Sequence, residues 1–131
     1  MEKNDMKTYL RTEITAVGKD AADLVEGGVL ILFAEGAPEE LAEVSVLHRV
    51  AEGPLDEAPG PGAEILVGEV SAILTGLGDL AWNKIRDIGH VVINFNDSDT
   101  PDRPGEICAS TVNSEALVQA IHSGKEIVIR A

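Results

Sequence analysis

Three histidines are the side chains in this sequence best suited to catalysis or ligand binding: His48, His90 and His122. Near neutral pH an imidazole can exchange a proton, hold a metal ion or attack an electrophile. His48 lies within the run VSVLHRV and His90 opens the run HVVINF, so both are expected on short strands. His122 follows a helical pattern, and a partly buried, hydrogen-bonded histidine near that helix end is the simplest interpretation for it.

His48 stands out because of the face that it shares. In a strand, alternate residues point to the same side, which groups His48 with Val44, Val46 and Val50. A histidine among three valines lies either in the core or in an apolar surface patch. Desolvation disfavours the charged imidazolium, so the ring is expected to be neutral and therefore nucleophilic.

Metal and nucleotide chemistry find little support in the motifs. No histidine pair has the i, i+4 spacing of helical zinc sites, and the chain has no phosphate loop, dinucleotide fingerprint or paired-cysteine spacing. Asp97, Asp99 and Asp102 alternate as in a calcium loop, but the central glycine and terminal glutamate of that loop are missing. We therefore expect no metal and no organic cofactor.

The charge and the cysteine count limit the partners and the compartment. Ten Lys and Arg against 23 Asp and Glu give a net charge of −13, which repels nucleic acids and anionic membrane surfaces. The single Cys108 cannot form an internal disulfide and is expected to be a small apolar strand residue. The longest apolar run, Val29 to Ala34, is far shorter than the roughly 20 residues that span a bilayer. A cytoplasmic protein without direct membrane insertion is expected.

The elements that must position the histidines are mostly strands. At 131 residues the chain fits a single domain, 1–131. Eight short apolar runs predict a mainly β fold, a small closed or nearly closed barrel with one or two short helices. The expected strands are Thr8–Val17, Val29–Ala34, Val44–Val50, Ile65–Val67, Glu69–Leu74, His90–Phe95, Ile107–Val112 and Glu126–Arg130.

Two segments have the pattern of a helix. Asp79 to Asp87 is the stronger, with Asp79 as the expected cap and Gly89 as the expected end. Ser114 to Ile121 has the same pattern, and Ala37 to Ala42 is a candidate for a short turn of helix. The residues from Ala51 to Ala63 contain three prolines and three glycines and are expected to form an exposed loop.

Several stretches, in order along nearly the whole chain, resemble one protein family. They are ILFAEGAPEELAEVSVLH (31–48), PG (61–62), TGLGDLAWNKIRDIGHVVINF (75–95), PG (104–105) and SGKEIVI (123–129). Together they resemble the glucitol/sorbitol-specific enzyme IIA component of the bacterial phosphoenolpyruvate-dependent sugar phosphotransferase system. Two positions depart from that pattern: Val50, where some relatives carry a second histidine, and Lys84, where they carry an asparagine.

The resemblance implies a function and partners. Such a component is a phosphotransferase that works through a phosphohistidine, receiving a phosphoryl group from the carrier HPr. It passes the group to a cysteine of the IIB component, which serves the IIB/IIC sugar permease. The resemblance assigns the acceptor role to His48, and His90 falls on the other retained histidine. If the rings lie close together, an N–H of His90 can donate to the phosphoryl group on His48. The sequence does not show which nitrogen of His48 takes the phosphoryl group, and we expect Nε2, as the more exposed of the two.

Two other functions are open at this point. One is a non-catalytic regulatory or small-ligand-binding β-barrel in which His48 and His90 hold a ligand or each other. The other is a metal-dependent hydrolase, which requires both histidines and a carboxylate to converge. A carrier is expected to present His48 at the surface, with the acidic residues concentrated away from it, whereas a structural histidine can be buried.

Overall fold

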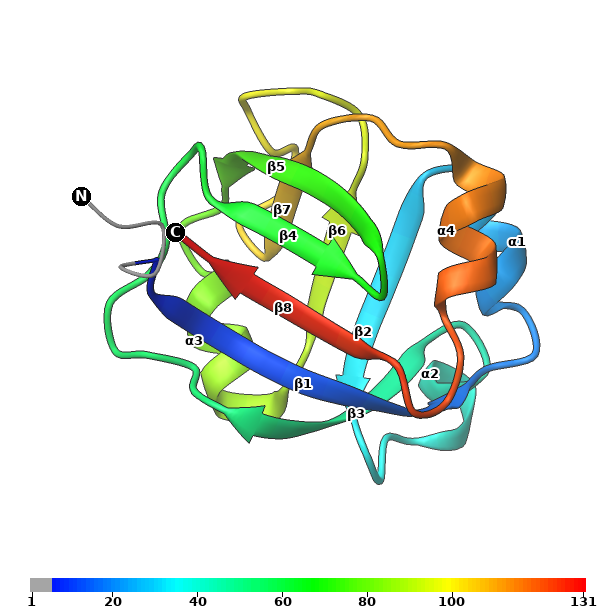
Figure 1. Cartoon of the computed structure of the whole chain (residues 1–131). Helices are drawn as coiled ribbons and strands as arrows, with labels where there is room; N and C mark the ends of the chain where they lie inside the picture. Colours follow the sequence, from blue (N-terminus) through cyan, green and yellow to red (C-terminus); the bar gives the residue numbers. More distant parts are fainter. Residues whose placement is uncertain (1–5) are drawn as a thin grey trace.

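Eight strands close into a barrel in the computed structural model, which describes residues 6–131 (Figure 1). The strand order around the barrel is β1-β3-β2-β6-β7-β5-β4-β8. The prediction of a mainly β, closed barrel of short strands is confirmed. The strands are β1 (Thr8–Val17), β2 (Val29–Ala34), β3 (Val46–Glu52), β4 (Glu64–Val67), β5 (Val70–Leu77), β6 (Val91–Asn94), β7 (Glu106–Ala109) and β8 (Glu126–Arg130).

Two of the strand pairs are parallel, β2 with β3 and β6 with β7, and the other pairs are antiparallel. In β3, His48 lies opposite Ala34 of β2 and opposite Ile14 of β1. Both neighbours come from segments rich in apolar residues. The pairing therefore encloses His48 between two strands of the barrel wall.

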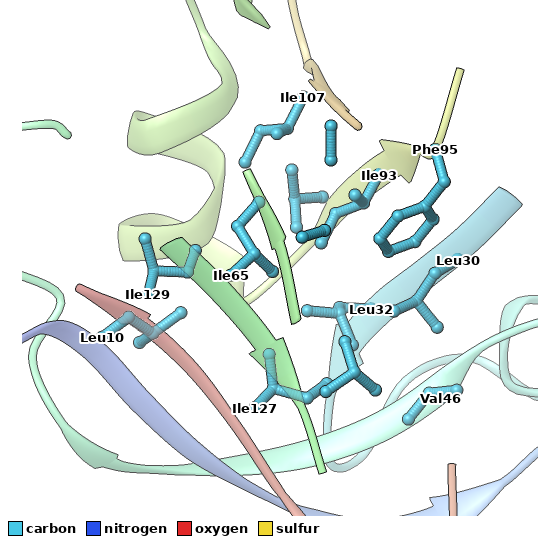
Figure 2. Packing of buried hydrophobic residues seen from close by; sticks show 14 of the residues in the cluster. Leu10, Leu30, Leu32, Val46, Ile65, Ile93, Phe95, Ile107, Ile127 and Ile129 are labelled. Carbon is cyan, nitrogen blue, oxygen red and sulfur yellow. The ribbon is translucent and has the colours of Figure 1, made fainter. Parts of the chain in front are cut away.

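Aliphatic side chains that alternate along the strands fill the barrel interior (Figure 2). Leu10 and Ile14 of β1, and Ile127 and Ile129 of β8, are fully or almost fully buried. Thr12 lies between Leu10 and Ile14 in the alternation and is also fully buried. The inner face of β1 thus carries one hydroxyl group in an otherwise apolar row.

Within residues 6–131, four short helices accompany the barrel: α1 (Ala21–Glu26), α2 (Glu39–Ala42), α3 (Ala81–Ile88) and α4 (Ser114–Ala120). The segments expected to be helical overlap α2, α3 and α4, although α3 ends one residue beyond Asp87, and no sequence pattern predicted α1. Asp79 does not cap α3, whose N-cap is Leu80 without a side-chain bond, and Asn113 rather than Ser114 caps α4. The expected end of α3 at Gly89 is confirmed, with φ of 65°.

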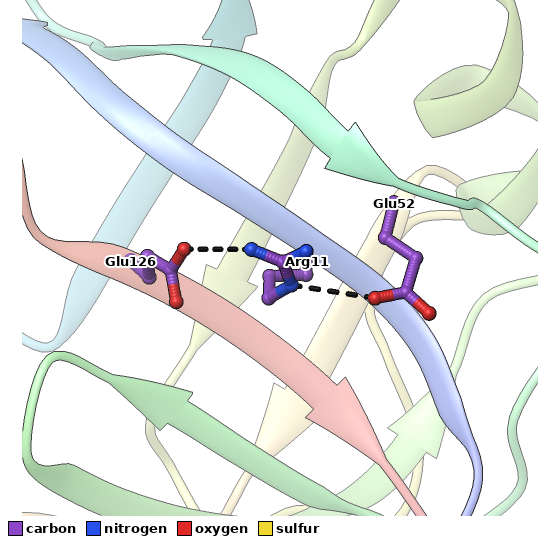
Figure 3. A network of polar contacts seen from close by, with 3 residues as sticks. All are labelled: Arg11, Glu52 and Glu126. Carbon is purple, nitrogen blue, oxygen red and sulfur yellow. Dashed lines mark hydrogen bonds and ion pairs between the residues drawn. The ribbon is translucent and has the colours of Figure 1, made fainter.

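A surface ion network joins three neighbouring strands (Figure 3). Arg11 of β1 donates to Glu52 of β3 at 3.3 Å and to Glu126 of β8 at 2.9 Å. All three side chains are well exposed, and pairs of this kind stabilise a protein by roughly 0.2–1 kcal/mol each. Burial of the aliphatic interior therefore contributes far more to the stability of the barrel.

Candidate functional site

His48 points into the barrel with Val46, and only 2% of its surface is exposed. Of the two positions open to this histidine, the core and an apolar surface patch, the structure has the core, so the surface position expected of a carrier is not found. Alternation along β3 puts its side chain on the inner face, and β1, β2 and the end of α3 enclose it there. Of the other valines expected on this face, Val50 is exposed.

Both ring nitrogens of His48 are hydrogen-bonded. Nε2 lies 2.7 Å from the carbonyl oxygen of Gly89, and Nδ1 lies 2.6 Å from Oγ1 of Thr12. A carbonyl oxygen can only accept, so Nε2 carries the hydrogen and Nδ1 accepts from the Thr12 hydroxyl. The remaining lone pair of the neutral ring is therefore on Nδ1. Nε2, expected to be the more exposed nitrogen and the one that takes the phosphoryl group, instead carries the hydrogen and faces Gly89.

Gly89 is suited to this contact by its backbone. It ends α3 in the left-handed region, with its amide donating to the carbonyl of Ile85 at 2.9 Å. A Cβ at this position would lie 2.7 Å from the Cβ of Ala34, well inside van der Waals contact. Only glycine satisfies both the conformation and the close approach, which brings the carbonyl of residue 89 onto the His48 ring.

Burial governs the charge of His48. It lowers the pKa of the ring below the ordinary value of 6.5, although the Gly89 carbonyl and the charge of Glu35 act in the opposite direction. Glu35 is itself engaged, since Arg49 donates to both of its carboxylate oxygens at 3.1 Å and lowers the pKa of the Glu35 carboxyl. His48 is therefore a neutral imidazole at neutral pH.

His90 lies at the junction of α3 and β6 and has different partners. Its Nδ1 lies 3.0 Å from the carbonyl oxygen of Leu32, so Nδ1 carries the hydrogen. The ring stacks on Phe33, with centroids 4.8 Å apart. In residues 6–131 the two histidine rings make no hydrogen bond to each other, and the Gly89–His90 peptide is what connects them.

His90 also lines a pocket of about 340 Å³ between α3, β6 and the segment before β7. The other lining residues are Lys84, Val92, Arg103, Pro104, Gly105 and Glu106. No sequence pattern predicted a role for Lys84, Arg103 or Thr12. Thr12 could have been identified from the sequence, because its polar side chain lies on the apolar face of a strand, as that of His48 does. The grouping of Lys84 with Arg103 depends on tertiary structure.

The other candidates occupy separate places. Cys108 is almost fully buried on β7. His122, expected to be partly buried, is instead exposed beyond α4. Within the described part of the chain, no group of three His, Cys, Asp or Glu side chains could hold a metal ion. The convergence required for a metal-dependent hydrolase is therefore not found there.

None of the helices in residues 6–131 combines the length and the apolar character needed to cross a bilayer.

Known proteins resemble this chain over most of its length. The family model described as "PTS system glucitol/sorbitol-specific IIA component" matches residues 9–128. The "PTS system glucitol/sorbitol-specific EIIA component" of Escherichia coli (strain K12) is 32% identical over 102 residues, covering 78% of this chain and 81% of that protein. The protein of the same description from Shigella flexneri gives the same values.

A solved structure supports the fold. The crystal structure of a PTS system IIA component from Enterococcus faecalis V583 has a TM-score of 0.66, covering 89% of this chain and 96% of that chain. The sequence identity is 19%, so this likeness concerns the fold alone.

Proposed function

Because this chain belongs to the glucitol/sorbitol-specific IIA component family of the phosphotransferase system, we propose that it is a cytoplasmic phosphocarrier for uptake of that class of sugar alcohol. In this proposal it accepts a phosphoryl group from phosphorylated HPr and passes it to a cysteine of the IIB component. The sugar is handled by the IIB/IIC permease, so this chain needs neither a sugar site nor a cofactor.

The proposed acceptor is His48, and the observation that carries this assignment is the state of its ring. The neutral imidazole has its hydrogen on Nε2, which leaves the lone pair of Nδ1 for attack on phosphorus once the Thr12 hydroxyl moves away. The new Nδ1–P bond forms as the N–P bond to HPr breaks, and that electron pair returns to the HPr ring. The ring of His48 becomes positively charged, and the Gly89 carbonyl stabilises this charge through the Nε2–H bond.

Burial adds a requirement to this proposal. Since His48 is 2% exposed, a phosphoryl donor can reach Nδ1 only after an element that covers the ring has moved. Phosphoryl transfer depends mainly on positioning and on charge stabilisation, so a short opening that aligns the two rings suffices. Burial of the same ring also favours the second candidate, a non-catalytic barrel module in which His48 has a purely structural role.

The test is intact-protein mass spectrometry after incubation with phosphoenolpyruvate, enzyme I and HPr. Wild type should gain one acid-labile phosphoryl group and lose it again on addition of the IIB component. His48→Gln, which retains side-chain volume, should gain none, and circular dichroism would check that it folds. His122→Gln is the matched control and should behave as wild type, because the His122 side chain is exposed and is not a hydrogen-bond partner of His48 in residues 6–131.

His90→Gln separates the roles of the two histidines. It should still be phosphorylated, at a lower rate, since His90 is adjacent to the Gly89 carbonyl that orients His48. No phosphorylation of wild type would favour the barrel module. Phosphorylation of folded His48→Gln, combined with none of His90→Gln, would move the acceptor role to His90.

A further inference from the structure

We propose that the pocket beside His90 is a binding site for a tetrahedral oxyanion of the phosphate class, with Lys84 and Arg103 as its cationic ligands. The pocket measures about 340 Å³ and opens between α3, β6 and the segment leading into β7. This site does not depend on which histidine is phosphorylated, and it would be present in a chain that accepted no phosphoryl group.

The two cations are available for a ligand. In the described residues neither Lys84 nor Arg103 has a carboxylate oxygen within 4.0 Å of its charged nitrogens, whereas Arg11, Arg49 and Arg130 are all paired. Five of the nine Lys and Arg residues in the described part of this acidic chain thus have a carboxylate partner. Two cations that share a pocket instead create a local excess of positive charge.

The backbone around Gly105 holds Lys84 at the pocket. A Cβ at position 105 would lie 3.1 Å from both Cδ and Nζ of Lys84, so the lysine side chain packs across the bare backbone of Gly105. The Leu80 amide donates to the Pro104 carbonyl at 2.8 Å, and the Gly78 amide donates to the Glu106 carbonyl at 2.8 Å. These bonds tie the Arg103 segment to the start of α3, so the pocket is preformed.

His90 supplies a third polar group. Its Nδ1–H is used by the Leu32 carbonyl and its ring is stacked on Phe33, which together fix the ring plane. Nε2 is the nitrogen left for a ligand in the pocket, and because it carries the lone pair of the neutral ring it can accept a hydrogen bond from a protonated oxygen of a hydrogen phosphate. Glu106 is the one carboxylate in the lining, and its Oε1 accepts from Nδ2 of Asn94 at 3.1 Å. Two cations against one carboxylate leave a net positive site that prefers a dianion.

The pocket is coupled to His48 through one peptide unit. The carbonyl of Gly89 accepts from Nε2 of His48, and the amide of His90 in the same peptide donates to the Lys84 carbonyl at 3.3 Å. An anion bound to the side chains of Lys84 and His90 would therefore contact the residue that supplies the amide of this peptide and the residue whose carbonyl accepts from that amide. The pocket is thus positioned to hold a phosphoryl group, free or attached to a larger molecule, beside the element that orients His48.

The test uses the isolated chain with inorganic phosphate at constant ionic strength, without any phosphotransfer protein. Side-chain NMR signals of His90 should shift in a saturable manner with a millimolar dissociation constant. Lys84→Gln and Arg103→Gln should each weaken binding about tenfold, as expected for loss of a charge-assisted hydrogen bond. Lys125→Gln, the same charge change at an exposed position outside this pocket, should leave the dissociation constant unchanged.

Methyl phosphate in place of inorganic phosphate distinguishes the two sources of the anion. Equal binding would support a pocket that accepts a phosphoryl group attached to a larger molecule, and binding of inorganic phosphate alone would support a site for the free ion. The proposal is overturned if His90 shows no saturable shift with either ligand, or if Lys125→Gln weakens binding as much as Lys84→Gln does. Neither outcome bears on phosphorylation of His48, which the mass-spectrometric experiment measures separately.

Discussion

The carbonyl oxygen of Gly89 lies 2.7 Å from Nε2 of His48, across a separation of 41 residues in the chain. This bond decides the tautomer of a buried histidine, because the carbonyl can only accept. It also joins the end of α3 to the inner face of β3. The state of the His48 ring therefore depends on how α3 ends.

The two histidines should have opposite tautomers. We expect the hydrogen of neutral His48 on Nε2 and that of neutral His90 on Nδ1, since a backbone carbonyl faces each of these atoms. Nitrogen-15 NMR of the imidazole rings at neutral pH distinguishes a protonated from an unprotonated ring nitrogen. A hydrogen on Nδ1 of His48 would contradict the proposed attacking nitrogen.

Gly89→Ala should destabilise the protein through two separate effects. A left-handed conformation costs a non-glycine residue about 1–2 kcal/mol, and the collision of the new Cβ with Ala34 adds about 1–3 kcal/mol. Urea unfolding measures the sum. Gly124→Ala is the matched control, because Gly124 also has positive φ but has open space around it. Equal losses in the two variants would show that the contact with Ala34 contributes nothing.

Thr12→Val should destabilise the fold by about 1–3 kcal/mol, because Nδ1 of His48 would lose its donor in the barrel interior. The change keeps the shape of the side chain, so packing is largely retained. Thr8→Val, a half-buried position of the same strand whose hydroxyl makes no hydrogen bond in the described residues, should change the free energy of unfolding by less than about 0.5 kcal/mol. A loss no larger than that of Thr8→Val would remove Thr12 from the site.

The free energy of unfolding should decrease as the pH is lowered below the ordinary pKa of histidine. Burial lowers the pKa of folded His48 below 6.5, so the unfolded chain binds its proton at higher pH than the folded chain. The contribution of His48 is complete above 6.5 and is lost as the pH falls from there towards the folded pKa. Urea unfolding between about pH 8 and pH 5 should show this slope in wild type and in His122→Gln. His48→Gln should have a shallower slope, and an unchanged slope would place the titration elsewhere.

The sequence by itself determined the secondary structure of most of the chain and the residue that marks the site. Alternating apolar runs predicted the strands, and Gly89 correctly predicted the end of α3, because strand formation and helix termination both depend on local backbone preferences. The number of short strands in turn predicted a closed or nearly closed barrel. The same alternation placed His48 on an apolar face. The motifs from Ile31 to Phe95 also indicated the family to which the chain belongs.

Tertiary structure alone decided whether that apolar face was an inner or an outer surface. Alternation groups the residues that share a side of a strand, but it carries no information about which side a closed barrel encloses. The burial of His48, its bonds to Thr12 and Gly89, and the meeting of Lys84 with Arg103 all join residues far apart in the chain. Such contacts arise from barrel closure and from the docking of α3, and no local pattern in the sequence encodes them.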